Sequence, residues 1–376
     1  MTHDTLMRFV IGCTLVAALA APVRAGTPTL YVSMMGTDAP ECGEKRNPCR
    51  TISRAVQNAP DGALVVVGPG RYGDLNADGV LDADPEAGEE DPVPCGSASC
   101  AVRLSKPITV VSSDGPGATV IDAGTKLLAG VFVTSDDVQL GREKQGFTIA
   151  GAKAEAVLVR AGNVRVEGNI VSGNAAHGVM LDVGARSVVH RNTVAGNGGR
   201  GVVVARDAID AIVSENHVAG NGYGGSGGGL MVRAPAVVVG NVLSANEGPG
   251  IEVGGANVRI EGNRITGNFD VGVELGEGGQ IVRGNAVTGN AGVGVVVGPG
   301  VDAEVTGNDL FGNHDENCAL LNLSPALIDA SDNYWGAPGG PGATPADDVC
   351  DAVAGAQTTI APVREKAVEP KLAVGR

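Results

Sequence analysis

The stretch EGNRITGN, residues 261–268, places two Gly-Asn pairs five residues apart around a short apolar segment. The same arrangement, or a close variant, occurs seven times in the chain. The first asparagines of the pairs are Asn169, Asn192, Asn216, Asn241, Asn263, Asn285 and Asn308. Their partners, five residues later, are Asn174, Asn197, Asn221, Asn246, Asn268, Asn290 and Asn313. Successive first asparagines are 23, 24, 25, 22, 22 and 23 residues apart, a period typical of a solenoid.

Each repeat contains three short apolar segments, which in one repeat are residues 258–260, 265–266 and 273–275. Apolar and polar residues alternate in these segments, and β-branched residues dominate, so the pattern predicts strands. A helical repeat of this length would not tolerate Gly-Asn every few residues.

Parallel strands that are joined by tight turns, with no helix between them, must form coils stacked about 4.8 Å apart. Equivalent residues of successive coils then form columns. An inward asparagine can donate its amide to the asparagine of the next coil and accept from the previous one, while glycine allows the adjacent turn a positive φ. We therefore interpret the asparagines as structural, with a row of ligand-binding amides as the alternative.

The composition excludes some classes of partner and predicts an exported protein. The formal net charge of −15 argues against nucleic acid and anionic membranes, which both require a basic surface. Arg8 precedes an apolar run over residues 9–21, and Val23-Arg24-Ala25 fits a cleavage site, so residues 1–25 are expected to be a signal peptide. This run is too short to cross a membrane. The expected location is secreted or periplasmic.

Removal of residues 1–25 leaves six cysteines, an even number that suits an oxidising compartment. Six cysteines allow fifteen connectivities. Sequence separation favours the pairs Cys42–Cys49, Cys95–Cys100 and Cys318–Cys350. Free or differently paired thiols remain the alternative.

Three further segments carry a resemblance to a known family. TLYVSMMGTDAP (29–40) and NPCRTISRAVQNAPDGALVVVGPGRY (47–72) resemble the N-terminal module of secreted bacterial β-helix proteins. DASDNYWGAPGGPG (329–342), followed by DDVC (347–350), resembles their final coil. Over residues 29–352 the chain thus resembles the right-handed parallel β-helix family, the pectate-lyase-like superfold. The resemblance is specific for the fold and much less so for activity.

The expected fold is an all-β, right-handed parallel β-helix of about eleven coils, forming a rod about 50 Å long. A short helix over residues 51–59, with Ile52, Ala55 and Val56 on one face, is expected to cap its first coil. We expect a cap module with an insertion at 29–100, repeats and a C-terminal cap at 101–352, and a loose tail at 353–376.

The insertion contains DLNADGVLDAD, residues 74–84, which follows the ligand order of a calcium loop. The expected ligands are the side chains of Asp74, Asn76, Asp78 and Asp82 and the carbonyl of Val80. Position twelve is Pro85, where an acid is usual. We expect a structural Ca²⁺, with a solvated acidic turn as the alternative.

Enzymes of the resembled superfold bind substrate along the outer face of one sheet. Here the outward column of each third strand reads Leu158, Met180, Val203, Met231, Glu252, Glu274 and Val296. Neighbouring positions add His177, Arg200, Asp182, Arg206, Arg233 and Asp270. The adjacent glutamates could share a proton and act as acid or base, and the arginines could neutralise a uronate carboxylate. A merely solvated, charged face is the alternative.

The candidate catalytic residues are therefore Glu252, Glu274, His177, Arg200 and Arg233. The candidate binding residues are Tyr223, Asp182, Arg206 and Asp270. Tyr223 is included because it lies in the Gly-rich loop GYGGSGGG beside the groove strand, one of only two lengthened turns.

Two classes of function stay open. The motifs of polygalacturonase-like hydrolases and alginate epimerases are missing, and only Asp136-Asp137 resembles one of them. This and the short turns favour a protein that binds extracellular or cell-surface polysaccharide, or serves as a surface scaffold, without catalysis. The alternative is a lyase or hydrolase of acidic polysaccharide with an atypical active site.

Overall fold

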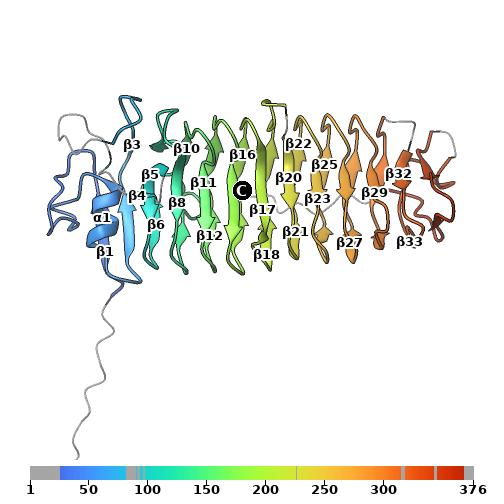
Figure 1. Cartoon of the computed structure of the whole chain (residues 1–376), viewed down its shortest axis with the longest axis horizontal. Helices are drawn as coiled ribbons and strands as arrows, with labels where there is room; N and C mark the ends of the chain where they lie inside the picture. Colours follow the sequence, from blue (N-terminus) through green and yellow to red (C-terminus); the bar gives the residue numbers. More distant parts are fainter. Residues whose placement is uncertain are drawn as a thin grey trace, which may run out of the picture.

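A computed structural model describes residues 26–81, 90, 94–95, 98–225, 227–314, 318–342 and 345–367, without the side chains of 94, 95 and 98. The expected signal peptide lies outside these residues, as does Asp82 of the expected calcium loop. The described part is a rod of stacked coils (Figure 1), and each regular coil contributes one strand to each of three sheets. Among the described residues, no helix is long and apolar enough to cross a membrane.

The first sheet has 13 strands and the second has 10. In order, the first sheet contains β1 (Thr29–Val32), β2 (Leu64–Val67), β6 (Thr109–Ser112), β9 (Gln139–Leu140), β12 (Arg165–Glu167), β15 (Val188–His190), β18 (Ala211–Ser214), β21 (Ala236–Val239), β24 (Arg259–Glu261), β27 (Gln280–Arg283), β30 (Ala303–Thr306), β33 (Leu327–Asp329) and β35 (Gln357–Thr359). The second contains β3 (Gly70–Gly73), β7 (Thr119–Asp122), β10 (Thr148–Ala150), β13 (Ile170–Ser172), β16 (Thr193–Ala195), β19 (His217–Ala219), β22 (Val242–Ser244), β25 (Arg264–Thr266), β28 (Ala286–Thr288) and β31 (Asp309–Phe311).

The third sheet has 12 strands. In order, it contains β4 (Pro94–Cys95), β5 (Ala98–Leu104), β8 (Ala129–Val133), β11 (Val157–Arg160), β14 (Val179–Val183), β17 (Arg200–Asp207), β20 (Gly228–Val232), β23 (Ile251–Val253), β26 (Val273–Leu275), β29 (Val295–Val297), β32 (Cys318–Asn322) and β34 (Asp348–Asp351). All pairs are parallel except β4 with β5. The all-β solenoid is therefore confirmed, and the three strand counts bracket the expected eleven coils.

The turns on either side of the second sheet are lined by two buried columns of asparagines. In both columns each Nδ2 donates to Oδ1 of the asparagine one coil later, over 2.8–3.1 Å. Gly262 and Gly267 adopt φ of 62° and 63° beside their asparagines, a conformation that favours glycine. The asparagines are thus structural, as predicted.

The ends of the two columns extend the predicted pattern. The backbone N–H groups of Phe147 and Ala152 bond to Oδ1 of Asn169 and Asn174 and begin the columns. Asn333 adds one asparagine to the first column. The second column ends at Asn313, whose backbone N–H donates to Asp347.

The core is a column of small aliphatic side chains beneath each sheet. In the first sheet it includes Val166, Val189, Val213 and Val238, which are fully buried and lie in register on successive strands. Each such side chain contributes roughly 1.5–3 kcal/mol through burial. Because every coil repeats this column, the solenoid needs few aromatic residues.

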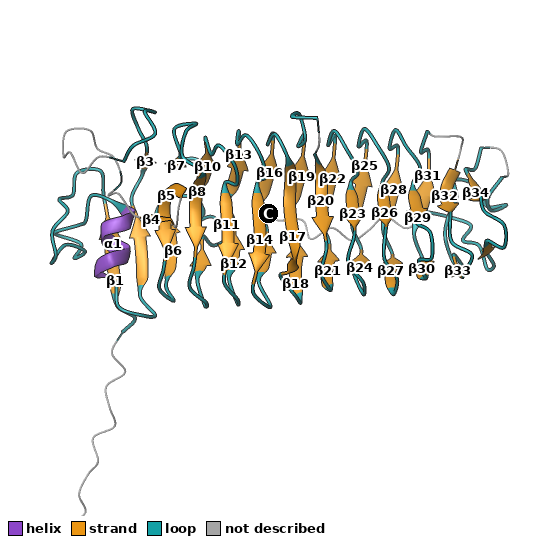
Figure 2. Ribbon diagram, in the orientation of Figure 1, coloured by secondary structure: helices purple, strands orange, loops and turns teal. Residues whose placement is uncertain are grey.

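The one helix among the described residues, α1 (Ile52–Asn58), covers the first coil beside β1 (Figure 2). Thr51 is its N-cap and accepts a hydrogen bond from the Arg54 backbone. Ile52, Ala55 and Val56 are buried in the core, so the predicted capping helix and its inward face are confirmed.

The C-terminal segment differs from the loose tail expected from residue 353. Residues 357–359 form β35, which pairs in parallel with β33, and Val363 packs against the core. Arg364 bonds to the Gly307 carbonyl and forms an ion pair with Asp332. The segment lacks apolar periodicity because it forms only one further strand, and backbone bonds together with the side chains of Thr358, Ile360, Val363 and Arg364 attach it.

Two of the three predicted disulfides are present, Cys42–Cys49 and Cys318–Cys350. Cys100 is also disulfide-bonded. The side chain of Cys95, its predicted partner, lies outside the described part of the chain.

Candidate functional site

The outward column of the third sheet has the register predicted from the sequence. Leu158, Met180, Val203, Met231, Glu252, Glu274 and Val296 are paired in that order on successive strands. Phe132 precedes Leu158 and Leu321 follows Val296. The outer face of this sheet is therefore a continuous strip that is apolar from Phe132 to Met231, acidic at Glu252 and Glu274, and apolar again at Val296 and Leu321.

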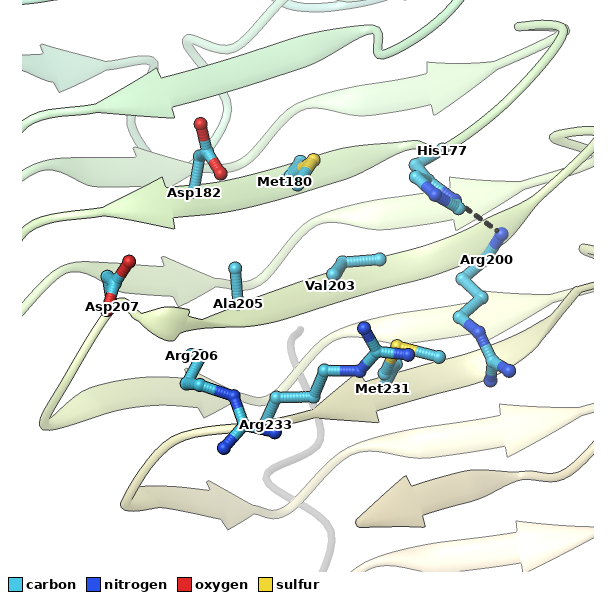
Figure 3. A pocket seen from close by; sticks show the side chains of 10 residues that line it. All are labelled: His177, Met180, Asp182, Arg200, Val203, Ala205, Arg206, Asp207, Met231 and Arg233. Carbon is cyan, nitrogen blue, oxygen red and sulfur yellow. Dashed lines mark hydrogen bonds between the residues drawn. The ribbon is translucent and has the colours of Figure 1, made fainter. Parts of the chain in front are cut away.

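A pocket of about 470 Å³ opens on this face, over β14, β17 and β20 (Figure 3). Its floor contains the column residues Met180, Val203 and Met231. The other lining residues are His177, Asp182, Arg200, Ala205, Arg206, Asp207 and Arg233. The fold thus brings together five of the predicted site residues, His177, Asp182, Arg200, Arg206 and Arg233, from three successive coils.

An irregularity in β17 forms one wall of the pocket. β17 has eight residues, whereas β23 and β26 have three each. Its pairing with β14 shifts after Val204, so that Asp207 is the partner of Val183. The shift is a β-bulge, which re-aims side chains at the edge of a regular sheet. It adds Ala205 and Asp207, which the sequence interpretation missed; the long uninterrupted run RGVVVARD was the available signal.

The charges in the pocket are unevenly paired. Asp182 forms an ion pair with Arg160, 2.7 Å long. Among the described residues, Arg206 and Arg233 form no ion pair with any carboxylate. Asp207, which also lines the pocket, is the one lining carboxylate outside these ion pairs, so the two guanidinium groups leave a local excess of positive charge that suits an anion, on a chain of net charge −15.

Arg200 connects the pocket to the acidic part of the column. Its backbone N–H donates to Nδ1 of His177 over 3.0 Å, and its guanidinium forms an ion pair with Glu252, two strands away. The guanidinium passes close to Gly228, where a Cβ atom would lie 3.3 Å from Nη1. Nη1 itself is buried and has no hydrogen-bond partner among the described residues.

His177 acts as a neutral hydrogen-bond donor in this geometry. Burial, its largest cause, and the nearby Arg200 charge lower the pKa of His177, while Glu155 opposes the shift. Because Nδ1 accepts the Arg200 N–H, the single proton of the neutral ring resides on Nε2. The nitrogen that remains available to a ligand therefore donates, so His177 is poorly placed to remove a proton.

The sequence of the rod matches a known family over its central coils. Residues 130–233 and 156–310 match the family model described as "Right handed beta helix region". The chain is a right-handed parallel β-helix. No curated protein matches this β-helix in sequence.

Three solved structures illustrate the similarity of the fold. Pectate lyase Pel9A is 15% identical, with a TM-score of 0.51, and the match covers 91% of this β-helix and 80% of the lyase. The A-module of the Azotobacter vinelandii mannuronan C-5 epimerase AlgE6 is 15% identical, with a TM-score of 0.53 and coverage of 84% and 94%. XylC in complex with xylose is 10% identical, with a TM-score of 0.55 and coverage of 76% and 69%.

The two glutamates of the outward column are adjacent but lie outside the pocket. Glu252 and Glu274 are register partners on β23 and β26. Burial, then the charges of Glu252 and Asp270, raise the pKa of Glu274, while Arg200 opposes the shift. Asp270 thus acts on Glu274 and does not line the pocket. The candidate catalytic residues are split between a basic pocket and an acidic neighbour.

Tyr223 does not line the pocket. It is 61% exposed, and its hydroxyl reaches back to the carbonyl of Asn174 over 3.3 Å. It lies on the turns beside the second asparagine column, at the opposite end of the strands from Arg206.

The apolar end of the outward column is packed in a second, smaller cluster outside the β-helix core. Phe132 and Leu158 contact Cys100 and Ala129 there, and Met180 packs against them. The Arg160 guanidinium lies 5.8 Å from the Phe132 ring centre. The apolar residues of the outward column from Phe132 to Met231 therefore divide between this packed cluster and the floor of the pocket.

The acidic loop of the β-helix is held by its own backbone. The N–H groups of Gly79, Asp78 and Val80 donate to side-chain oxygens of Asp74, Asn76 and Asp78, respectively. Gly79 has a φ of 89°. The side chains of Asp74, Asn76 and Asp78 thus place oxygen atoms, the ligand type of a hard cation, on one turn.

Proposed function

We propose that this β-helix is an exported protein that binds acidic, uronate-containing polysaccharide at the pocket over β14, β17 and β20. The observation that carries the proposal is the pair Arg206 and Arg233, which line the pocket and, within the described part of the chain, form no ion pair. A uronate offers the missing carboxylates, and the apolar floor of Met180, Val203 and Met231 can contact the faces of sugar rings.

Two further observations support the proposal. The solved structures of similar fold include proteins named for pectate and mannuronan. The disulfides Cys42–Cys49 and Cys318–Cys350 are typical of an oxidising compartment. An exported protein in such a compartment has access to extracellular polysaccharides.

Binding without catalysis fits the site better than turnover. His177 donates from its free nitrogen, and Glu252 is paired with Arg200, so neither is a ready general base. The raised pKa of Glu274 favours the alternative, a lyase or hydrolase in which this residue holds the proton.

Calorimetric titration of the mature protein with oligogalacturonate and oligomannuronate tests the proposal. Arg206→Ala and Arg233→Ala should each weaken binding about tenfold, the loss of one charge-assisted hydrogen bond. Arg264→Ala, which removes a similar charge from the second sheet, is the matched control and should bind like the wild type. Equal affinity of all three variants would contradict the proposed pocket.

The same samples separate the alternatives. Growth of unsaturated-uronate absorbance or of reducing ends, abolished by Glu274→Gln, would show an enzyme. No binding of either oligomer to the wild type would leave the scaffold function.

A further inference from the structure

The Arg200 guanidinium is held in an arrangement that leaves part of it unsatisfied. Nη2 is paired with Glu252, whereas Nη1 is buried against Gly228 and finds no hydrogen-bond partner in the part of the chain that the structure describes. A buried donor without an acceptor is unfavourable. A rotation of the guanidinium toward the pocket, which Arg200 already lines, would expose this nitrogen to an acceptor.

In this contact the carboxylate of Glu252 lies against the Arg200 guanidinium, where the carboxylate of a ligand could also bind. Glu252 comes from β23, outside the pocket, and its side chain is 28% exposed against 12% for Arg200. The ion pair is partly buried, and a sugar carboxylate that replaces Glu252 leaves the Arg200 guanidinium paired, so it can compete for Arg200 with modest loss.

We propose that Glu252 occupies, in the free protein, the place on Arg200 that a ligand carboxylate takes on binding, and that its release couples binding to the uptake of one proton. This inference rests on the proposed function. It makes Glu252 an internal competitor of the ligand and makes affinity depend on pH.

The proton is taken up because of the groups that face Glu252. Its neighbours in the column are Met231 and Glu274, and Asp270 acts on Glu274. Among the described residues, Arg200 forms the ion pair with Glu252, and its charge also acts on Glu274. Once Arg200 turns to the ligand, two adjacent carboxylates lack a counter-ion, so that one of them binds a proton from the buffer.

The direction of the pH dependence follows from the linkage between proton uptake and ligand binding. Binding that takes up a proton strengthens as the pH falls, by up to about tenfold per pH unit. The dependence on pH extends from the pKa of Glu274 in the free protein, which burial already raises, to its higher pKa in the complex. The ligand's own carboxylate stays ionised there.

Calorimetry with the oligouronate that binds, in two buffers of different ionisation enthalpy at pH 5 to 8, tests the coupling. Wild type should show proton uptake and tighter binding at low pH. Glu252→Gln, which keeps the shape of the side chain, should abolish most of the uptake and bind about two- to fivefold more tightly at pH 7, the factor of a weak ion pair. Glu274→Gln should also reduce uptake, and thermal unfolding should confirm that both variants fold.

The outcomes separate the two proposals. Binding without proton uptake, or weaker binding by Glu252→Gln, would overturn the exchange and leave the polysaccharide site intact. No binding of any oligouronate to wild type or Glu252→Gln would remove the proposed function, and the exchange with it.

Discussion

Asn241 and Asn263, one coil apart and fully buried, are joined by a hydrogen bond of 2.9 Å from Nδ2 to Oδ1. Asn241 also donates to the Val213 carbonyl and accepts from the backbone N–H and the Nδ2 of Asn216. One side chain thus satisfies groups on three coils, and its repetition fixes the stacking register of the rod.

Replacement of Asn241 by alanine should destabilise the protein by about 1–3 kcal/mol, because it leaves buried donors of Asn216 and the Val213 carbonyl unpaired. Asn169→Ala should lower the free energy of unfolding by less, because the residue that precedes Asn169 in the column, Phe147, has no side-chain amide and donates only its backbone N–H. Urea unfolding measures both, with the exposed Asn47→Ala as control. Small and equal effects would show that the columns are not a source of stability.

Because the Glu90 carboxyl group is buried, we expect the stability of the protein to depend on pH. Glu90 accepts hydrogen bonds from the backbone of Ile52 and Ser53, 2.8 and 2.7 Å long, at the start of α1. Burial raises its pKa from 4.5 to about 7 against these bonds, with a smaller contribution from Asp38. Because the folded-state pKa is the higher one, this contribution to stability is complete below pH 4.5 and is lost as the pH rises through 7.

The free energy of unfolding should therefore fall between about pH 5 and 8, by at most about 3 kcal/mol from this group. Glu90→Gln should flatten the profile in this window, whereas the exposed Glu41→Gln should leave it unchanged. Denaturant unfolding at pH 5, 6, 7 and 8 makes the comparison. A profile that Glu90→Gln does not alter would assign the dependence to other groups.

We propose that Ca²⁺ binds the loop of Asp74, Asn76, Asp78, Val80 and Asp82 and orders the insertion. Without a cation the carboxylates repel one another, so chelation should lower the melting temperature modestly and increase proteolysis between residues 74 and 94. Asp78→Ala should give the same phenotype and be insensitive to chelator, and Asp61→Ala should behave like wild type. Absence of binding at millimolar Ca²⁺ would leave only a solvated turn.

The Cys318–Cys350 disulfide closes a loop over a sequence separation of 32 residues. Its replacement by two serines should lower stability by about 3–4 kcal/mol through the restored entropy of the unfolded chain. The loss should concentrate in the last coils, β32 to β35, and hydrogen exchange resolves it along the rod. Uniform loss of protection would show that the solenoid unfolds as one unit.

The sequence predicted most of the fold and about half of the site. The seven repeats gave the coil, the asparagine columns and the register of the outward column from Leu158 to Val296, because each depends on local period and on the alternation of side chains. The chemistry was harder to place. Tyr223 and Asp270 were expected beside the groove, yet neither lines the pocket: Tyr223 lies on the turn before β20 and is exposed, and Asp270 precedes β26, beyond the strands that form the pocket.

The sequence by itself determined a parallel solenoid, its inward asparagines, its capping helix and the order of residues along the third sheet. All of these follow from spacing, turn chemistry and apolar pattern. Only the tertiary structure decided that the bulge of β17 forms a pocket. It also decided that Arg160 forms an ion pair with Asp182, whereas Arg206 and Arg233 form none with any described carboxylate. The same is true of the ion pair between Arg200 and Glu252, which passes Gly228. These contacts join residues up to 52 positions apart. They depend on side-chain direction and on a register shift, which a periodic sequence does not encode.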